Sequence, residues 1–222
     1  MRLKMNAFDT LRQNKEIRAI IDRVNEMNGD IFYACHSWYH VEFVVKTAEY
    51  ILRTLDYDER VVEAGKVAAL LHDIGNIAGR TNHAHKSAAL AAVFMENIAD
   101  FTPEEKAEII QAIKDHTDGK DVQSAVGAAL LIADKIDVCK ERLIPVPVPD
   151  LLYNELKKLD YASINIANDV ISINFDVREG FDKALLVREY RKSFVLPTKA
   201  AELLGCECRF LYNGEKYNWQ EC

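Results

Sequence analysis

The stretch Leu71-His72-Asp73-Ile74-Gly75-Asn76 decides how this chain is interpreted. It follows a helix that we predict over residues 58–71, because valine, alanine and leucine recur there at helical spacing. Gly75 favours a helix end at this point. Adjacent side chains diverge by about 100° inside a helix, whereas at a loosened helix end His72 and Asp73 can both turn toward one point.

The first two thirds of the chain reads as a set of helices. We predict them over about 8–27, 41–55, 58–71, 83–98, from 102 onward, and 124–141. At the start of the helix from 102, Thr102 can cap, Pro103 suits the first helical position, and Glu105 completes a capping box. All the histidines of the chain lie in this part: His36, His40, His72, His83, His85 and His116.

Several polar residues of this part lie on apolar helix faces. His40 lies one turn before Val44 and two turns before Ala48, at the edge of the apolar stripe of the predicted helix 41–55. His116 lies one turn after Ile113 and two turns after Ile109. Asp134 lies on the apolar face of the predicted helix 124–141, where a carboxylate costs several kcal/mol unless a cation or strong donors meet it. Helices that each deliver a ligand-type side chain to the interior are typical of metal sites in helical bundles.

These residues, in this order, resemble the HD-domain metal-dependent phosphohydrolase superfamily over about residues 36–142. His40, Val44 and Ala48 match its H-x-x-x-V-x-x-x-A pattern, the pair His72-Asp73 matches its tandem, and Ala133-Asp134-Lys135 matches its final aspartate. Two further segments look like those of the six-ligand members, which hold two metals: His83-Ala84-His85-Lys86-Ser87-Ala88 and Ile113-Lys114-Asp115-His116-Thr117-Asp118-Gly119. The subgroup most similar to this chain is the HD-type diadenosine tetraphosphate hydrolases, with their H-T-x-G segment and an A-D-x-I-[ED] segment that ends in an arginine.

The resemblance implies six metal ligands and a divalent metal cofactor of two ions, with Asp73 bridging them. The implied ligands are His40, His72, Asp73, His83, His116 and Asp134. His85 competes with His83 for the third histidine, and the spacing to Ser87-Ala88 favours His83. His36 does not fit the pattern and is expected outside the ligand set. Imidazole with carboxylate and no thiol suits iron or manganese, with zinc, cobalt and magnesium as alternatives.

The implied activity is hydrolysis of a phosphate ester or anhydride by a metal-activated hydroxide, with a nucleotide as the expected substrate. Asp73 would orient the attacking group, and Lys135 would neutralise charge on the phosphate. Arg80, His85, Lys140 and Arg142 are candidates for binding further phosphates of the substrate.

Two other functions stay open at this point. The same six ligands serve di-iron oxygenases of the inositol-oxygenase type, and a nucleotide-binding regulatory module could signal through the C-terminal part. Asn76 stands where related sequences often carry lysine, which removes one expected phosphate contact. No G-Y-P motif follows His116. The cyclic-di-GMP phosphodiesterase group therefore fits poorly.

The composition of the chain changes after residue 143. The alternating prolines of Ile144-Pro145-Val146-Pro147-Val148-Pro149 predict an extended bend, followed by a short helix over about 150–159. Alternating residues predict strands over 163–167 and 170–175 around a hairpin turn at Asn168-Asp169, then a helix over 181–203 and a strand over 207–212. We expect a mainly α fold: a helical HD metal-binding domain over 1–149 and a small β-β-α-β extension over 150–222, packed on the body.

Composition excludes several classes of protein. With 49% hydrophobic residues among 222, the chain can bury a core and is not disordered. A net charge of −7 disfavours broad contact with nucleic acid or an anionic membrane. We find neither a signal peptide nor an apolar run of membrane-spanning length. The five cysteines form no C-x-x-C pair, which favours a reducing, cytoplasmic location. A small phosphorylated substrate is the expected partner, and the extension is a candidate surface for a homodimer.

Overall fold

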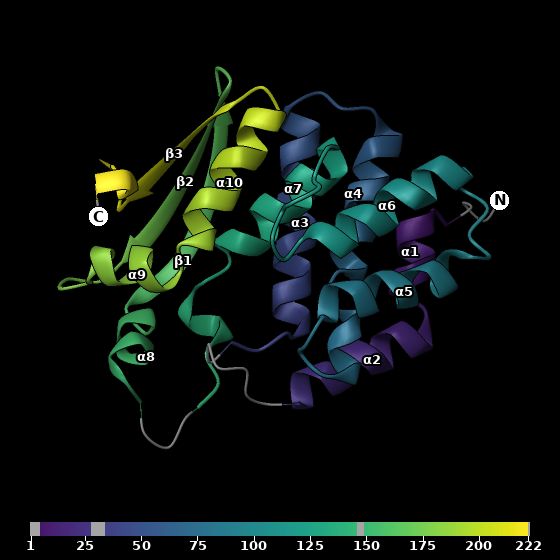
Figure 1. Cartoon of the computed structure of the whole chain (residues 1–222), viewed down its shortest axis with the longest axis horizontal. Helices are drawn as coiled ribbons and strands as arrows, with labels where there is room; N and C mark the ends of the chain where they lie inside the picture. Colours follow the sequence, from purple (N-terminus) through teal and green to yellow (C-terminus); the bar gives the residue numbers. More distant parts are fainter. Residues whose placement is uncertain (1–4, 28–33, 146–148, 222) are drawn as a thin grey trace.

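The computed structural model describes residues 5–27, 34–145 and 149–221, and it confirms the expected mainly helical fold with a small C-terminal sheet (Figure 1). The helices of the larger part lie side by side (Figure 1). The sheet lies at the other end of the molecule, and α10 packs between it and α7. The helical elements of this part are α1 (Ala7–Arg12), α2 (Lys15–Glu26), α3 (Trp38–Thr54), α4 (Glu59–Leu71), the 3₁₀ helix η1 (Ile74–Ala78), α5 (His83–Met95), α6 (Pro103–Asp115), α7 (Ala125–Ile136) and the 3₁₀ helix η2 (Lys140–Arg142).

Polar caps set where these helices begin. Asp58 caps α4, and Thr102 and Glu105 form the predicted capping box of α6. The single helix predicted over 8–27 is wrong, because the Asn14 side chain accepts hydrogen bonds from the amides of Glu16 and Ile17 and starts α2 separately. The predicted helix 124–141 is also too long, since α7 ends at Ile136 and η2 follows it.

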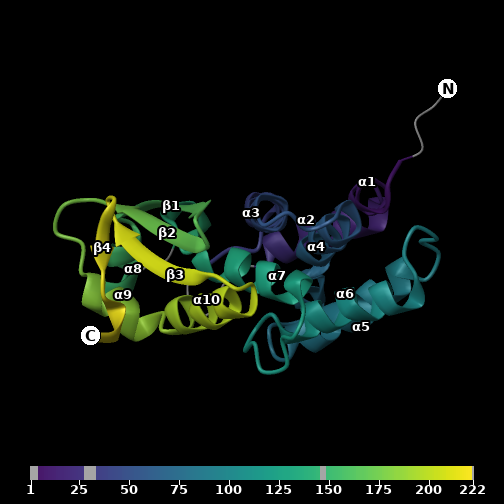
Figure 2. The ribbon, with the colours of Figure 1, turned by 90° about the horizontal axis from the view of Figure 1, so that it is seen from above.

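Helix α7 joins the two parts of the molecule. Nine of its twelve residues are buried, from Val126 to Ala133 and at Ile136. It packs against α3, α4 and α6 on one side and against α10 (Lys192–Leu203) on the other. Figure 2 shows α7 and α10 together between the helices and the sheet. A polar residue near the end of α7, such as Asp134, is therefore held by both parts of the chain.

Gly75 has a different role from the helix end that the sequence suggests. It lies inside η1, and a Cβ atom there would come 2.2 Å from the backbone nitrogen of Ser87 and 2.5 Å from the carbonyl oxygen of His83. The Gly75 amide donates a hydrogen bond of 2.8 Å to Ser87 Oγ. Only glycine permits this approach of η1 to α5, which brings the segment after His72 close to His83.

The C-terminal part forms a four-stranded sheet in the order β1-β2-β3-β4. Its elements are α8 (Leu151–Leu156), β1 (Leu159–Ala167), β2 (Val170–Val177), α9 (Lys183–Glu189), α10 (Lys192–Leu203), β3 (Glu207–Tyr212), β4 (Glu215–Tyr217) and the 3₁₀ helix η3 (Trp219–Glu221). Strands β1 and β2 are antiparallel around the predicted turn, where Asn168 and Asp169 both have positive φ. Strand β3 runs parallel to β2 after the crossover through α9 and α10.

Two sequence expectations for this part need correction. The predicted helix 181–203 is divided at Tyr190, which has φ −112° and ψ 37° and ends α9. A run of charged and polar residues over 188–192 interrupts the apolar pattern at this point. The fourth strand β4 is also absent from the prediction. In the bend predicted over 144–149, residues 146–148 lie outside the described residues.

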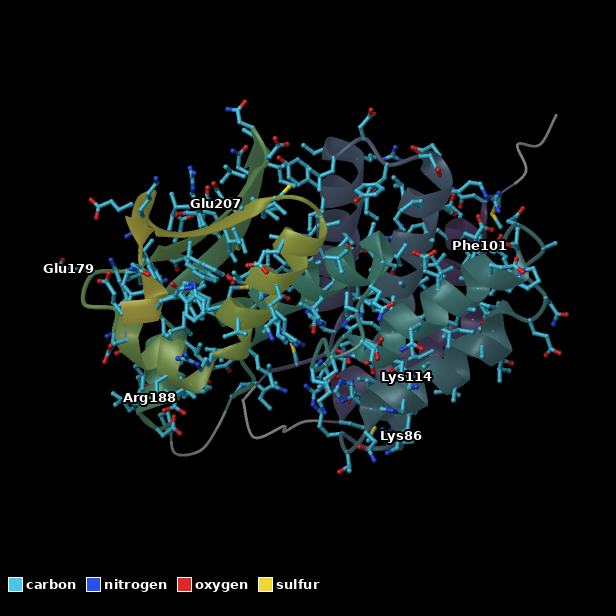
Figure 3. The ribbon with its side chains drawn as sticks, turned by 45° about the horizontal axis from the view of Figure 1, so that its top comes forward. Lys86, Phe101, Lys114, Glu179, Arg188 and Glu207 are labelled. Carbon is cyan, nitrogen blue, oxygen red and sulfur yellow. The ribbon has the colours of Figure 1, made fainter. Side chains whose placement is uncertain are left out.

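Charged side chains project from both parts of the molecule. In Figure 3, Lys86 and Lys114 extend from the helical part, and Glu179, Arg188 and Glu207 extend from the part with the sheet. No helix among residues 5–27, 34–145 and 149–221 is long and apolar enough to cross a membrane.

Candidate metal centre

The six ligand-type residues come from five helices and meet inside the helical part. His40 lies in the first turn of α3, His72 is the C-cap of α4, and Asp73 follows it directly. His83 opens α5, His116 is the C-cap of α6, and Asp134 lies near the end of α7. His40 and His72 are fully buried, His116 is 1% exposed, and the Asp134 side chain is 11% exposed.

All four histidines of this set direct Nε2 toward the centre. His72 Nδ1 donates to the Ala69 carbonyl at 2.8 Å and His116 Nδ1 to the Ile113 carbonyl at 2.6 Å. His83 Nδ1 contacts the Arg80 carbonyl at 3.2 Å in the same way. Because a carbonyl only accepts, each of these Nδ1 atoms carries a proton, which leaves Nε2 as the ring atom that can bind a metal. This is how metal-ligating histidines are oriented.

One group of ligand atoms surrounds His40 and His72. Their Nε2 atoms lie 3.2 Å apart. Asp134 Oδ1 lies 3.4 Å from His40 Nε2 and 3.7 Å from His72 Nε2. Asp73 Oδ2 lies 3.6 Å from His40 Nε2 and 3.2 Å from His72 Nε2. These distances fit four donors around one cation.

A second group surrounds His83 and His116. Their Nε2 atoms also lie 3.2 Å apart, and Asp73 Oδ1 is 3.3 Å from the first and 3.7 Å from the second. Asp73 thus turns one carboxylate oxygen toward each group. Two neutral imidazoles whose lone pairs face each other repel, and a cation between them removes that repulsion. The donor set of both groups therefore fits bound divalent metal.

The charges of the centre also suit a cation. Burial raises the pKa of Asp73, but the nearby His72 and His36 rings outweigh it and hold this pKa well below its usual range. Burial likewise raises the pKa of Asp134, and Lys135 and His40 outweigh it. Both carboxylates are therefore ionised, as metal ligands must be. Burial, with the nearby charge of Arg80, outweighs Asp73 and lowers the pKa of His83 to about 4, which keeps its ring neutral.

Asp137 is a residue of the centre that the ligand search in the sequence missed. It is fully buried, and His40 Nδ1 donates to its Oδ2 at 2.7 Å. The Cys139 thiol donates to its Oδ1 at 3.2 Å. A carboxylate behind a ligating histidine fixes the ring and raises its basicity. The available signal was the A-D-x-I-[ED] pattern, whose last position is Asp137.

Arg142 stabilises this arrangement and also lines the cavity beside the centre. It is 8% exposed, and its guanidinium donates to the carbonyls of Asp137 at 2.8 Å and Cys35 at 3.1 and 3.2 Å. Its Nη2 also lies 3.2 Å from His36 Nδ1, which in turn lies 2.8 Å from Asp73 Oδ2. Most donors of Arg142 are used inside the protein, and its contact with a phosphate of the substrate stays a prediction. His36 contacts the central carboxylate although the sequence pattern excludes it.

The other predicted substrate-binding residues are placed differently. Arg80 lies at the entrance, with Nη1 at 3.2 Å from Asn76 Oδ1 and 3.9 Å from Asp73 Oδ1. Lys135 Nζ bonds Asp134 Oδ2 and lines the cavity. His85 is exposed and outside that lining, because it lies two positions along α5 from the inward-facing His83. Lys140 is also outside the lining, because it pairs with Asp160 of β1. The role of His85 and Lys140 in substrate binding therefore stays a prediction that this cavity does not support.

A cavity of about 380 Å³ opens from the centre to the surface. This volume lies at the lower end of the range for small-molecule sites, which is about 300–1,000 Å³. Asp73, His83, His116 and Asp134 form its floor, and its wall includes Arg80 and Lys135 together with residues 189–193 of the C-terminal part.

Comparison with known proteins identifies the domain that holds this centre. The family model of the HD domain matches residues 37–139, the part of the chain that holds the six ligand-type residues. The chain is similar to the uncharacterized protein MJ1020 of Methanocaldococcus jannaschii, with 26% identity over 202 residues that cover 81% of this chain and 74% of the relative.

The comparison with solved structures gives a partial match. It is described as a predicted HD superfamily hydrolase from an uncultured Thermotogales bacterium. The match has 24% sequence identity and a TM-score of 0.44, and it covers 60% of this chain and 74% of that chain.

Proposed function

We propose that this protein is a metal-dependent phosphohydrolase that cleaves a phosphate ester or anhydride of a small substrate, in the first place a nucleotide. The observation that carries the proposal is the position of Asp73, with one carboxylate oxygen facing each pair of histidines. Such a carboxylate suits a bridge between two divalent ions. The match to the HD domain supports the same interpretation. We further propose the division into a metal-binding domain over 1–149 and an extension over 150–222.

Six residues would hold the metal: His40, His72 and Asp134 on one side, His83 and His116 on the other, and Asp73 between them. Two such ions clamp a phosphate and lower the pKa of a bound water toward 7. We propose iron or manganese, which suit mixed imidazole and carboxylate ligands. The described cysteines are free thiols, which supports a reducing, cytoplasmic location.

The remaining residues of the cavity would act on the substrate. Lys135 and Arg80 place positive charge beside the centre, where negative charge grows on the phosphoryl oxygens during attack. Asp73 would orient the attacking water. Hydrolysis adds the hydroxyl of water to phosphorus, breaks the bond to the leaving oxygen, and delivers the proton of water to that oxygen. Buried Asp137 would keep His40 in the tautomer that presents Nε2.

Metal content and phosphatase activity of one batch test this proposal. The protein is purified without a histidine tag, its metals are measured by elemental analysis, and a panel of phosphate esters and anhydrides is assayed. We expect about two metal ions per chain, as a two-metal site requires, and release of phosphate or nucleotide. Iron with oxygen uptake and no hydrolysis would instead indicate an oxygenase.

A matched pair of variants tests the ligand assignment. His83→Ala should keep one metal and lose most activity, because His83 faces Asp73 Oδ1. His85→Ala, two residues away on the exposed face of the same helix, should keep both metals and full activity. Equal metal content in the two variants would overturn the assignment.

A further inference from the structure

The α9–α10 junction of the C-terminal part forms one wall of the metal cavity. Residues 189–193 line the cavity together with the metal-binding groups of α4 to α7. The junction exists because α9 ends at Tyr190 and α10 begins after Arg191. The phosphohydrolase proposal uses the floor of the cavity together with Arg80 and Lys135, and it gives no role to residues 189–193.

The junction adds positive charge to the cavity. Arg191 and Lys192 both line it, next to Arg80 and Lys135 from the helical part. Arg191 lies over the Trp219 ring at 5.7 Å, and Lys192 Nζ donates to the Thr117 carbonyl at 3.4 Å. Within the part of the chain that the structure describes, neither forms an ion pair with a carboxylate. Of the acidic groups around the junction, Asp118 pairs with Lys120 and Glu189 with Arg188, and Lys192 also helps to hold the pKa of Asp118 below its usual value.

The positive charge of this wall contrasts in sign with the net charge of the whole chain. The chain as a whole carries a net charge of −7. The floor of the cavity holds carboxylates that metal would neutralise, whereas Lys135 is already paired with Asp134. Arg191 and Lys192 therefore add positive charge to this wall beyond the charge that the ion pairs of Asp134, Asp118 and Glu189 use. An anionic part of a ligand would meet that charge.

Thr117 gives an independent indication of a ligand on the same wall. Thr117 lines the cavity, and its hydroxyl oxygen is buried and has no hydrogen-bond partner among the described residues. A buried hydroxyl without a partner costs about 1–3 kcal/mol, so such groups generally have a function. The loop after His116 packs on α10, since a Cβ atom at Gly119 would lie 3.3 Å from a methyl carbon of Leu196. The Thr117 hydroxyl and the cations of the junction are thus held together.

We propose that Arg191, Lys192 and the Thr117 hydroxyl form a second anion subsite, so that the substrate carries two phosphate groups, one at the metals and one at this wall. The inference rests on the proposed phosphohydrolase function for the first phosphate only. It makes the extension a determinant of substrate choice: a small di- or polyphosphorylated compound is bound in preference to a monophosphate. Arg191 and Lys192 are substrate-positioning residues in this scheme.

Binding of inorganic pyrophosphate and inorganic phosphate to the metal-loaded protein tests the subsite without any turnover. Each is titrated calorimetrically, and the metal content is measured afterwards to show that no metal was removed. We expect pyrophosphate to bind about tenfold or more tightly than phosphate, because hydrogen bonds to charged groups contribute about 1.5–3 kcal/mol. Arg191→Ala/Lys192→Ala should reduce this advantage to less than about threefold and leave phosphate binding unchanged.

Two control variants keep the result specific. Lys199→Ala removes an exposed lysine of α10 that does not line the cavity, and it should keep the full advantage. Arg191→Lys/Lys192→Arg preserves the charge and should retain most of it, which excludes misfolding as the cause of a loss. The inference is overturned if pyrophosphate has no advantage in the unmodified protein, or if the advantage survives in the double alanine variant. Loss of the advantage in a protein that hydrolyses nothing would support the subsite and reject the phosphohydrolase.

Discussion

Replacing Asp137 by Asn should weaken metal binding at one group of ligands and leave the other intact. Asp137 is fully buried, and its Oδ2 accepts the Nδ1 proton of His40 at 2.7 Å. Asparagine keeps the volume of the side chain but removes its charge. His40 then loses the carboxylate that fixes its tautomer and raises the basicity of Nε2. No other ligand of the centre has a carboxylate on its Nδ1, since His72, His83 and His116 use backbone carbonyls.

The expected magnitude follows from the kind of contact that is lost. Removing the carboxylate behind a metal-ligating histidine costs about 10–100-fold in metal affinity. This corresponds to about 1.4–2.8 kcal/mol of binding free energy. The loss should affect one ion per chain, because the ligands around His83 have no contact with Asp137.

Competition with a chelator measures this effect directly. The protein is loaded with manganese or zinc and titrated with the chelator, so that the two ions are removed in separate steps. In Asp137→Asn, only the step that removes the ion at His40 should shift to a lower chelator concentration. Asp160→Asn serves as the control, because Asp160 pairs with Lys140 and Arg178 outside the cavity. Unchanged affinity in Asp137→Asn, or an equal loss at both ions, would refute the reasoning.

Three further predictions concern packing and titration. Gly75→Ala should lower the free energy of unfolding by about 2–3 kcal/mol in a urea titration, because its Cβ would lie 2.2 Å from the Ser87 nitrogen; an unchanged midpoint would contradict this. Thr117→Val should leave the stability unchanged or raise it by up to about 1 kcal/mol, because the buried hydroxyl has no described partner; a clear loss of stability would show that a partner exists. Burial raises the pKa of the Cys208 thiol from 9.0 to about 12, so the unfolded chain loses this proton at lower pH than the folded protein. The free energy of unfolding should therefore fall as the pH rises from about 9 to 12, and the fall should be smaller in Cys208→Ala than in the parent protein.

The sequence predicted the helical part well because its signals are local. Apolar spacing and capping residues such as Asp58 and Thr102 mark the helices where they occur. His40 and Asp134 could be picked out because a polar side chain on an apolar helix face requires a buried partner. His83 could be preferred to His85 only by a spacing pattern, and the structure shows the physical reason: one faces inward on α5 and the other faces solvent.

The remaining features depend on contacts between distant segments, which no local pattern records. Lys140 of the helical part pairs with Asp160 of β1 in the C-terminal part. Arg142 is buried against the carbonyl of Cys35, which lies more than one hundred residues away in the sequence. Neither partner could be chosen from the sequence. The division of α9 from α10 has the same origin. A charged run within a helical pattern is ordinarily a solvated face, and its role as a cavity wall becomes visible only when α10 packs on α7.

The most direct test of the central claim is an electron paramagnetic resonance spectrum of the manganese-loaded protein. The account places two divalent ions on the two oxygens of the Asp73 carboxylate, which requires ions about 3.5–4 Å apart. Manganese ions this close are magnetically coupled, so we predict the spectrum of a coupled pair, lost in Asp73→Asn. A spectrum of isolated, uncoupled manganese ions in the fully loaded protein, or a protein that takes up no manganese, iron or zinc, would contradict the account.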